Sequence, residues 1–269
     1  MEVKKKLVLW CGNAPNQKAL ANKIHMQFGL AGIVIDKKKK SLKKTTTGNL
    51  VQRIVNRIRF NKIDVAWKTL QRNYDYAYSD WPVVPLLEVD SINDENVKLF
   101  VTDISPDLII VSGTGLVKEQ LLSIPVEIGI INLHTGLSPY VKGGPNCTNW
   151  CIANNEWHLV GNTIMWINPG IDSGNIIVNE TVDIRECKDL TGVQLKVMDH
   201  AHDLYLRAVK YLIKTEPPYV SIPQSELGTG RLFLTKQWTS EMRSKLLKNW
   251  KNRKNISQAT PPLTIPLNN

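Results

Sequence analysis

DLIIV at residues 107–111 is the clearest buried strand in this sequence, and the turn SGTG at residues 112–115 follows it directly. A continuous apolar run of this length is typical of a strand buried on both faces of a parallel sheet. Residues 128–134, IGIINLH, form a second strand of this kind, with polar side chains only at its end. Ligands bind such sheets beyond the carboxyl ends of the strands. Residues 112–115 and 132–135 are therefore the first places to look for a site.

Strands and helices alternate through the first half of the chain. Residues 7–11 and 31–36 have the pattern of short buried strands, and apolar spacing predicts a helix between them that ends at Gly29. A second helical pattern covers residues 50–58, and residues 82–87, with two prolines, suit a strand end or an edge strand. This alternation predicts an α/β fold with a twisted, mainly parallel sheet of the Rossmann type.

The second half of the chain is organised differently. Residues 162–167 and 176–182 are strand-like, and residues 190–213 have the pattern of one long helix. We expect three parts: an N-terminal catalytic domain at residues 1–215, a small C-terminal extension with a strand and a basic helix at residues 216–257, and a loosely ordered tail at residues 258–269.

Composition limits the function classes. With 42% apolar and 22% charged residues among 269, the chain is an ordinary globular sequence, and no apolar run reaches the roughly 18–20 residues that cross a bilayer. The N-terminus lacks a signal-peptide cleavage site, so we expect a cytoplasmic protein with no membrane partner. The net charge of +10 favours anionic ligands without choosing among nucleic acid, phosphorylated small molecules and polycarboxylates. The four cysteines have no zinc-finger spacing, so we expect reduced thiols and no metal site.

Three patterns favour a structural interpretation. The six lysines within residues 37–44 indicate an exposed loop after a strand, in preference to a nucleic-acid contact or a localisation signal. On a helix, His200 and His202 point about 200° apart and cannot easily share a metal ion, so we expect both on the solvent side. Core packing, in preference to stacking on a ligand, is expected for Trp150, Trp157 and Trp166.

An amide, an imidazole and a carboxylate stand on elements that can converge. Asn132 and His134 are two residues apart on a strand, so they point to one face, and the Gly- and Pro-rich residues 135–145 can form a rigid loop beside them. Asp172 lies in the turn PGIDSG, residues 169–174. Such a trio favours acyl transfer. The amide and a protonated imidazole stabilise a developing oxyanion, while the carboxylate holds the imidazole and helps to remove a proton from an attacking amine.

Each member of the trio also has a structural alternative. His134 can be a hydrogen-bonded core histidine, Asp172 can cap its turn, and Asn132 can complete the hydrogen bonds of its strand. Their convergence and the loop that follows favour catalysis. No serine or cysteine stands out as a nucleophile, so direct transfer without a covalent enzyme intermediate is preferred.

NLHTGLSPY at residues 132–140, followed by Gly143-Gly144, together with PGIDSG at residues 169–174, resembles the signature of the 10-formyltetrahydrofolate-dependent formyltransferases. The resemblance covers about residues 80–215. It implies a formyltransferase-like fold with Asn132, His134 and Asp172 as the catalytic trio. It also implies that the pterin and formyl group bind at Ser112, Gly113, Thr114, Gly115 and Ile171, and the second substrate at Thr135, Gly136, Ser138, Tyr140 and Gly143.

Within this family, the sequence is most similar to sugar N-formyltransferases. Only about 55 residues follow the long helix, too few for the C-terminal barrel of methionyl-tRNA formyltransferases. CGNAP at residues 11–15 departs from the glycine-rich phosphate loop of glycinamide ribonucleotide formyltransferases. The stretches that look most like sugar N-formyltransferases are residues 83–89, 107–115 and 230–233.

The resemblance therefore implies formyl transfer from 10-formyltetrahydrofolate to the 4-amino group of a nucleotide-linked 4-amino-4,6-dideoxy sugar, with a dTDP-linked viosamine-type sugar favoured. It implies a nucleotide-sugar partner, a homodimer, no metal and no nucleic-acid partner. The alternatives are a methionyl-tRNA or ribonucleotide formyltransferase, and a non-catalytic module that binds nucleotide sugar or folate. A basic nucleic-acid-binding module is a third alternative, but the sequence contains no base-stacking motif and no groove-reading helix for it. The nucleotide, the choice between the C-3 and C-4 amine and the oligomeric state stay open.

Overall fold

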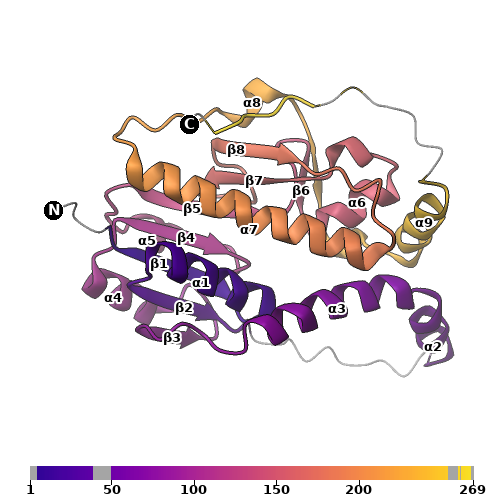
Figure 1. Cartoon of the computed structure of the whole chain (residues 1–269), viewed down its shortest axis with the longest axis horizontal. Helices are drawn as coiled ribbons and strands as arrows, with labels where there is room; N and C mark the ends of the chain where they lie inside the picture. Colours follow the sequence, from indigo (N-terminus) through magenta and orange to yellow (C-terminus); the bar gives the residue numbers. More distant parts are fainter. Residues whose placement is uncertain (1–4, 39–49, 254–259, 261, 268–269) are drawn as a thin grey trace.

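A seven-stranded sheet carries most of the core (Figure 1). The computed structural model describes residues 5–38, 50–253, 260 and 262–267. The strand order is β3-β2-β1-β4-β5-β7-β8, in which the first five are parallel and the last two antiparallel, so the predicted mainly parallel α/β sheet is confirmed. The strands are β1 (Leu7–Gly12), β2 (Gly32–Asp36), β3 (Leu86–Val89), β4 (Leu108–Ser112), β5 (Gly129–His134), β7 (Gly161–Trp166) and β8 (Ile176–Thr181).

Helices cover both faces of the sheet. On one face α1 (Pro15–Phe28), α3 (Asn61–Ala77) and α7 (Leu190–Lys214) pack against each other and against alternate side chains of the central strands. On the other face α4 (Glu95–Ile104) and α5 (Glu119–Leu122) cover the remaining side chains. Every residue of β1 and β4 is buried, which is the reason that these strands read as continuous apolar runs.

A smaller cluster forms around a second, two-stranded sheet. β6 (Val141–Gly143) pairs in parallel with β9 (Arg231–Phe233), and α6 (Cys147–Ala153) packs against α9 (Ser240–Lys251). The Trp150 indole stacks on the Phe233 ring with centroids 4.5 Å apart. The short strand and basic helix predicted after residue 216 are therefore present, and they pack on the loop that follows β5. The remaining elements are α2 (Leu50–Arg59), α8 (Gln224–Leu227) and two 3-10 turns, Trp157–Leu159 and Thr235–Gln237.

Both edges of the main sheet are restrained. β3 lies at one edge, in agreement with the two prolines that precede it. At the other edge, the chain near Ile265 lies against β8: the Asn179 amide donates to the Ile265 carbonyl (3.1 Å), and the Ile265 amide donates to Asn179 Oδ1 (2.7 Å). Ile265 is buried. Ile265 is thus fixed on β8, within the segment for which a loosely ordered tail is expected, and an otherwise open strand edge gains hydrogen bonds from it.

Several other expectations change in the structure. His202 is fully buried, and burial, together with Lys23, lowers its pKa to about 3, so the ring is neutral. His200 is half-buried and contacts Glu180 and Asn162, so the expectation that both histidines face solvent is wrong. Trp150 and Trp157 are core residues as expected, whereas Trp166 is only partly buried. Residues 39–44 of the lysine run lie outside the described residues.

The helices that the structure describes include none that is both long and apolar enough to cross a membrane. All four cysteines are free thiols, as the sequence predicted.

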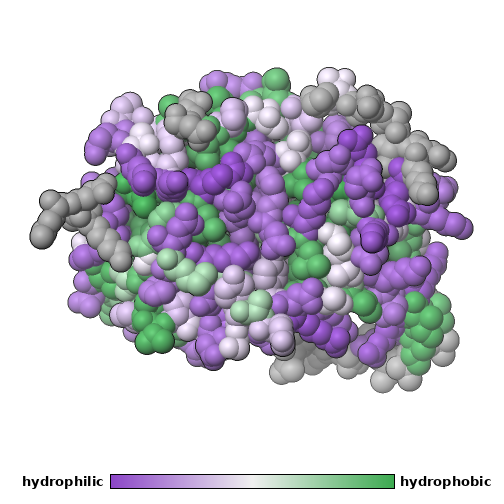
Figure 2. Space-filling view, in the orientation of Figure 1, coloured by the Kyte–Doolittle hydropathy of each residue, from purple (hydrophilic) through white to green (hydrophobic). Residues whose placement is uncertain are grey.

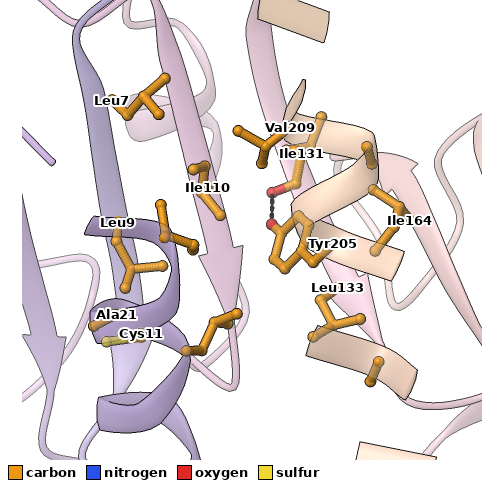
Figure 3. Packing of buried hydrophobic residues seen from close by; sticks show 14 of the residues in the cluster. Leu7, Leu9, Cys11, Ala21, Ile110, Ile131, Leu133, Ile164, Tyr205 and Val209 are labelled. Atoms are coloured by element: carbon orange, nitrogen blue, oxygen red, sulfur yellow. Dashed lines mark hydrogen bonds between the residues drawn. The ribbon is translucent and has the colours of Figure 1, made fainter. Parts of the chain in front are cut away.

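One buried hydroxyl joins the long helix to the centre of the sheet (Figure 3). Tyr205 of α7 is fully buried, and its Oη accepts a hydrogen bond from the Val111 amide at 2.9 Å. The carbonyl oxygens of Val111 and Ile131, each 2.9 Å from Oη, share its single proton. Val111 lies on β4 and Ile131 on β5, so the hydroxyl ties these two strands together one residue before Ser112 and Asn132.

The variant Tyr205→Phe is expected to lower the free energy of unfolding by about 1–3 kcal/mol, because it leaves a buried amide without this acceptor and two carbonyls without a donor. Urea denaturation followed by circular dichroism measures the loss. Tyr76→Phe is the matched control, since the Tyr76 side chain is 94% exposed and its hydroxyl should contribute nothing measurable. Equal stability of the two variants would contradict the role of the Tyr205 hydroxyl.

Candidate active site

A cleft of about 910 Å³ opens at the carboxyl ends of the parallel strands, where the sequence placed the site. Its volume lies in the range of small-molecule sites. The loops after β1 and β4 form one wall, and the loop between β7 and β8 forms another. Gly12 and Gly113 let the first two loops meet: a Cβ on Gly12 would lie 2.7 Å from the Gly113 carbonyl oxygen, and Gly113 has a φ of 69°.

Asn132 and His134 both line this cleft from β5. They face the same side because they are two residues apart on a strand that is held on both edges, by β4 and by β7. Asn132 is half-buried, and its side chain makes no hydrogen bond with any described residue. Its amide N–H groups are therefore available to a ligand.

His134 is buried and has a hydrogen-bond acceptor at each ring nitrogen. Nδ1 lies 3.2 Å from Asp172 Oδ2, and Nε2 lies 3.0 Å from the Val141 carbonyl oxygen. Two acceptors are satisfied together only when both nitrogens carry a proton, so the ring is an imidazolium. Burial alone would disfavour the charge. The Asp172 carboxylate, with smaller contributions from Cys147 and the Val141 carbonyl, outweighs it and raises the pKa of His134 to about 10.

Asp172 is held in place by three contacts from outside its own loop. Besides His134, its Oδ2 accepts a hydrogen bond from the Gly143 amide at 2.9 Å. Gln224 of α8 donates through Nε2 to the Asp172 carbonyl oxygen at 2.8 Å and to that of Gly174 at 2.9 Å. The residue has a φ of 48°, a conformation that Asp tolerates better than most residues. Its Oδ1 makes no hydrogen bond with the residues that the structure describes, and it remains a free acceptor.

Gly136 and Cys147 form the wall behind His134. A Cβ on Gly136 would collide with His134 Nε2 and lie 2.9 Å from both Cβ and Sγ of Cys147. The Cys147 thiol itself is 3.6 Å from Nε2 and 3.5 Å from the Gly143 carbonyl oxygen. The imidazolium therefore has no room to retreat from Asp172.

Three of the predicted substrate-binding residues do not line the cleft. Gly136 lies behind His134, and Ser138 is fully buried with its amide donating to Thr163 Oγ1 at 2.9 Å. The Tyr140 hydroxyl lies within hydrogen-bond distance of the Leu227 and Leu263 carbonyl oxygens, so this side chain holds the C-terminal segments. The predicted residues that do line the cleft are Ser112, Gly113, Thr114, Gly115, Asn132, His134, Thr135, Gly143, Ile171 and Asp172.

The cleft is also lined by residues that are not among those predicted from the sequence. Asp36 ends β2, and its Oδ2 accepts a hydrogen bond from the Gly115 amide at 2.7 Å, which fixes the loop after β4. Asn13 and Gln17 line the cleft near the start of α1, at the turn that follows the first strand. Trp67 lines it from α3 and is 40% exposed. The position of Asn13 at a strand end was a usable signal, whereas nothing marked Trp67, because its helix was not predicted.

Comparison with known proteins gives partial sequence matches. The methionyl-tRNA formyltransferase of Clostridium tetani is 29% identical over 133 residues, which are 49% of this chain and 42% of the relative. The alignment thus spans less than half the length of that curated relative.

Solved structures match over more of the chain. A 4-N formyltransferase from Francisella tularensis has a TM-score of 0.57 at 16% identity, and the match covers 91% of this chain and 88% of that one. Glycinamide ribonucleotide transformylase 1 from Symbiobacterium toebii has a TM-score of 0.54 at 14% identity, covering 81% and 93%. At these identities the likeness establishes the fold. Residues 4–209 match the formyl transferase family, and this chain belongs to that family.

Proposed function

We propose that this protein transfers a formyl group from 10-formyltetrahydrofolate to the amino group of a nucleotide-linked amino sugar. The observation that carries the proposal is the imidazolium of His134, held between Asp172 and the Val141 carbonyl, with the free amide of Asn132 beside it on one strand. For the acceptor, the finer proposal is the 4-amino group of a dTDP-linked 4-amino-4,6-dideoxy sugar of the viosamine type.

The cleft suits two ligands of this kind. Gly113 and Gly115 line the cleft in the loop after β4 and carry no side chain of their own, which favours the approach of a flat, polar ring such as a pterin to this backbone. The start of α1 and Lys38 also line the cleft, and a helix N-terminus and a cation favour a diphosphate. In this proposal the loop after β4 holds the folate, and the start of α1 with Lys38 holds the nucleotide.

10-Formyltetrahydrofolate supplies the formyl group, which passes from its nitrogen to the nitrogen of the acceptor. The Asn132 amide donates a hydrogen bond to the formyl oxygen, where negative charge develops as the amine attacks. His134 contributes its positive charge to the same oxygen. Because both of its nitrogens already have acceptors, this contribution is electrostatic and does not require a direct hydrogen bond.

The attacking amine must lose a proton, and Asp172 is the base placed to accept it. Its Oδ2 is occupied by His134 and Gly143, whereas Oδ1 is the free acceptor. Proton transfer to Oδ1 leaves His134 paired through Oδ2, so the positive charge stays beside the formyl oxygen during the transfer. When the tetrahedral intermediate collapses, the bond between the formyl carbon and the folate nitrogen breaks, and the proton on Oδ1 passes to that nitrogen. Tetrahydrofolate leaves, Asp172 is again a carboxylate, and no covalent bond to the protein forms.

Methionyl-tRNA is the second candidate acceptor, because the curated relatives include methionyl-tRNA formyltransferases. Among the residues described after α7, the only strand is β9, three residues long, and it pairs with β6. This part of the chain packs on the loop after β5, and its described residues form no separate sheet domain that could receive a large acceptor. The observation favours a small acceptor.

The test is an assay of the purified chain with 10-formyltetrahydrofolate and a panel of acceptors, with products identified by mass. The panel contains dTDP-, GDP- and UDP-linked 3- and 4-amino sugars, glycinamide ribonucleotide and charged initiator tRNA. A product from a 4-amino sugar whose gain in mass equals the replacement of one H by CHO supports the proposal. If only tRNA or only glycinamide ribonucleotide is formylated, that molecule is the acceptor and the nucleotide sugar is not. If the nucleotide sugars and the folate bind but no product forms, the catalytic proposal is contradicted.

His134→Asn and Asp172→Asn are each expected to lower kcat by about a thousand-fold or more, because each removes one half of the ion pair next to the reacting carbonyl. Steady-state kinetics with the accepted sugar measures the loss. His158→Asn is the matched control, since His158 lies outside the cleft and should keep normal turnover. Near-normal turnover of either cleft variant would refute the roles assigned here.

The charge of His134 predicts a direction of pH dependence. Its folded pKa of about 10 lies above the unfolded value of 6.5, so the ion pair stabilises the fold fully below pH 6.5 and loses this contribution as the pH rises toward 10. Nitrogen-15 NMR of labelled imidazoles is expected to show both nitrogens of His134 protonated at pH 8. The unfolding free energy of Asp172→Asn should approach that of the wild type as the pH rises from 7 to 10. A neutral His134 ring at pH 8 would contradict the assignment.

Gly136→Ala is expected to lower kcat at least ten-fold with a smaller change in KM, because the added methyl group would displace the His134 ring from Asp172. Kinetics at saturating and limiting acceptor separate the two constants. Gly192→Ala is the control, because a Cβ there would meet neighbours only at ordinary contact distances of 3.7 and 3.9 Å. An unchanged kcat in Gly136→Ala would show that the packing behind His134 does not position it.

A further inference from the structure

The positive charge of this chain is concentrated in one short segment. Residues 37–62 contain ten lysines and arginines and no aspartate or glutamate, which equals the net charge of +10 of the whole chain. The remaining residues are therefore balanced in charge overall. Of this segment, the described lining of the cleft includes only Lys37 and Lys38, so the arginines of α2 have no part in the proposed reaction.

Helix α2 lies within this segment and exposes an apolar face. Ile58 is 74% exposed, Ile54 52% and Val55 47%. At 100° per residue these three side chains fall within an arc of about 100°, and Arg57 and Arg59 stand on its two sides. The helix thus carries branched apolar side chains in the middle and cations at both borders, which is the arrangement of helices that lie in a lipid–water interface.

The helix stands at one end of the molecule, and the side chains of Ile54, Val55 and Ile58 are exposed there. Figure 1 places α2 at the tip of α3 and α9 at the same end, and Figure 2 shows a group of hydrophobic residues at this corner of the surface. Arg243 of α9 anchors the corner, since it pairs with Asp64 at 2.6 Å and lies 4.4 Å from the centre of the buried Phe60 ring. On α9, Lys248 and Lys251 add two exposed cations to the same end.

We propose that α2 binds the surface of an anionic phospholipid bilayer, with Ile54, Val55 and Ile58 inserted at the level of the acyl-chain boundary and Arg53, Arg57 and Arg59 against lipid phosphates. The inference rests on α2 and its charge, not on the proposed reaction. The sequence predicted no membrane partner because no segment can span a bilayer, but binding at the surface requires no such segment.

Charge complementarity selects this occupant over the alternatives. A second copy of α2 would bring Arg53, Arg57 and Arg59 of the two copies together, with no acidic residue in either helix, and the repulsion opposes that dimer. A nucleic acid would suit the arginines, but it would leave two exposed isoleucines and a valine without an apolar partner. Anionic lipid satisfies the cations and the apolar face together.

The test is co-sedimentation of the full-length protein with vesicles of phosphatidylcholine alone or mixed equally with phosphatidylglycerol. We expect binding to the anionic vesicles, at least ten-fold weaker binding to the neutral ones, and weakening as NaCl rises from 50 to 500 mM. Binding to neither vesicle, or equal binding to both, would overturn the proposal.

Variants distinguish binding through α2 from nonspecific binding of the protein to vesicles. The double variant Ile54→Ser/Ile58→Ser is expected to lower vesicle affinity at least ten-fold, whereas Leu99→Ser, at a 68% exposed leucine on α4, should leave it unchanged. Arg53→Gln/Arg57→Gln should weaken binding more than Lys196→Gln/Lys210→Gln, which removes the same charge from exposed positions on α7.

Circular dichroism and melting temperature establish that the variants are folded, and the formyltransferase assay without vesicles should give wild-type rates. A loss of solution dimerisation in Ile54→Ser/Ile58→Ser with unchanged vesicle binding would assign the surface to a second copy. Unchanged vesicle binding by this variant would also overturn the proposal. So would a wild-type protein that binds RNA and not vesicles, if the variant loses the RNA binding.

Discussion

The site depends on a positive charge that is kept inside the protein. His134 has little contact with water, and a buried cation is unfavourable unless acceptors surround it. Here the Asp172 carboxylate and the Val141 carbonyl oxygen occupy the two nitrogens, and Gly136 with Cys147 closes the space behind the ring. The charge, the orientation of the ring and the position of Asp172 are therefore one constraint, and a change in any of these groups affects the others.

This constraint explains why distant parts of the chain meet at the cleft. β5 supplies Asn132 and His134, the loop after it supplies Val141 and Gly143, and the loop between β7 and β8 supplies Asp172. The C-terminal extension contributes through Gln224, which donates to the backbone on both sides of Ser173. The extension is thus coupled to the carboxylate without contacting the imidazole. β6, which contains Val141 and Gly143, is in turn paired with β9 of the extension.

The two proposed functions occupy separate parts of the molecule. The cleft lies at the carboxyl ends of the parallel strands, and its lining does not include Ile54, Val55 or Ile58. α3 connects the two regions, because it follows α2 directly and contributes Trp67 to the cleft. A bilayer bound at α2 would not enter the cleft, and α3 is the element through which binding at one region can affect the other.

Local patterns in the sequence predicted most of the fold and the residues at the centre of the site. The runs at residues 107–111 and 128–134 predicted buried parallel strands because apolar side chains on both faces have no other stable location, and the two-residue spacing of Asn132 and His134 placed them on one face. Residues 262–267, His202 and Trp67 were different. Ile265 is held by the open edge of β8, and His202 is buried by the packing of α7 on α1 and α3. Trp67 reaches the cleft on α3, a helix that the sequence pattern did not predict. The same holds for the charge of His134, since the two acceptors that stabilise it come together only when the chain folds.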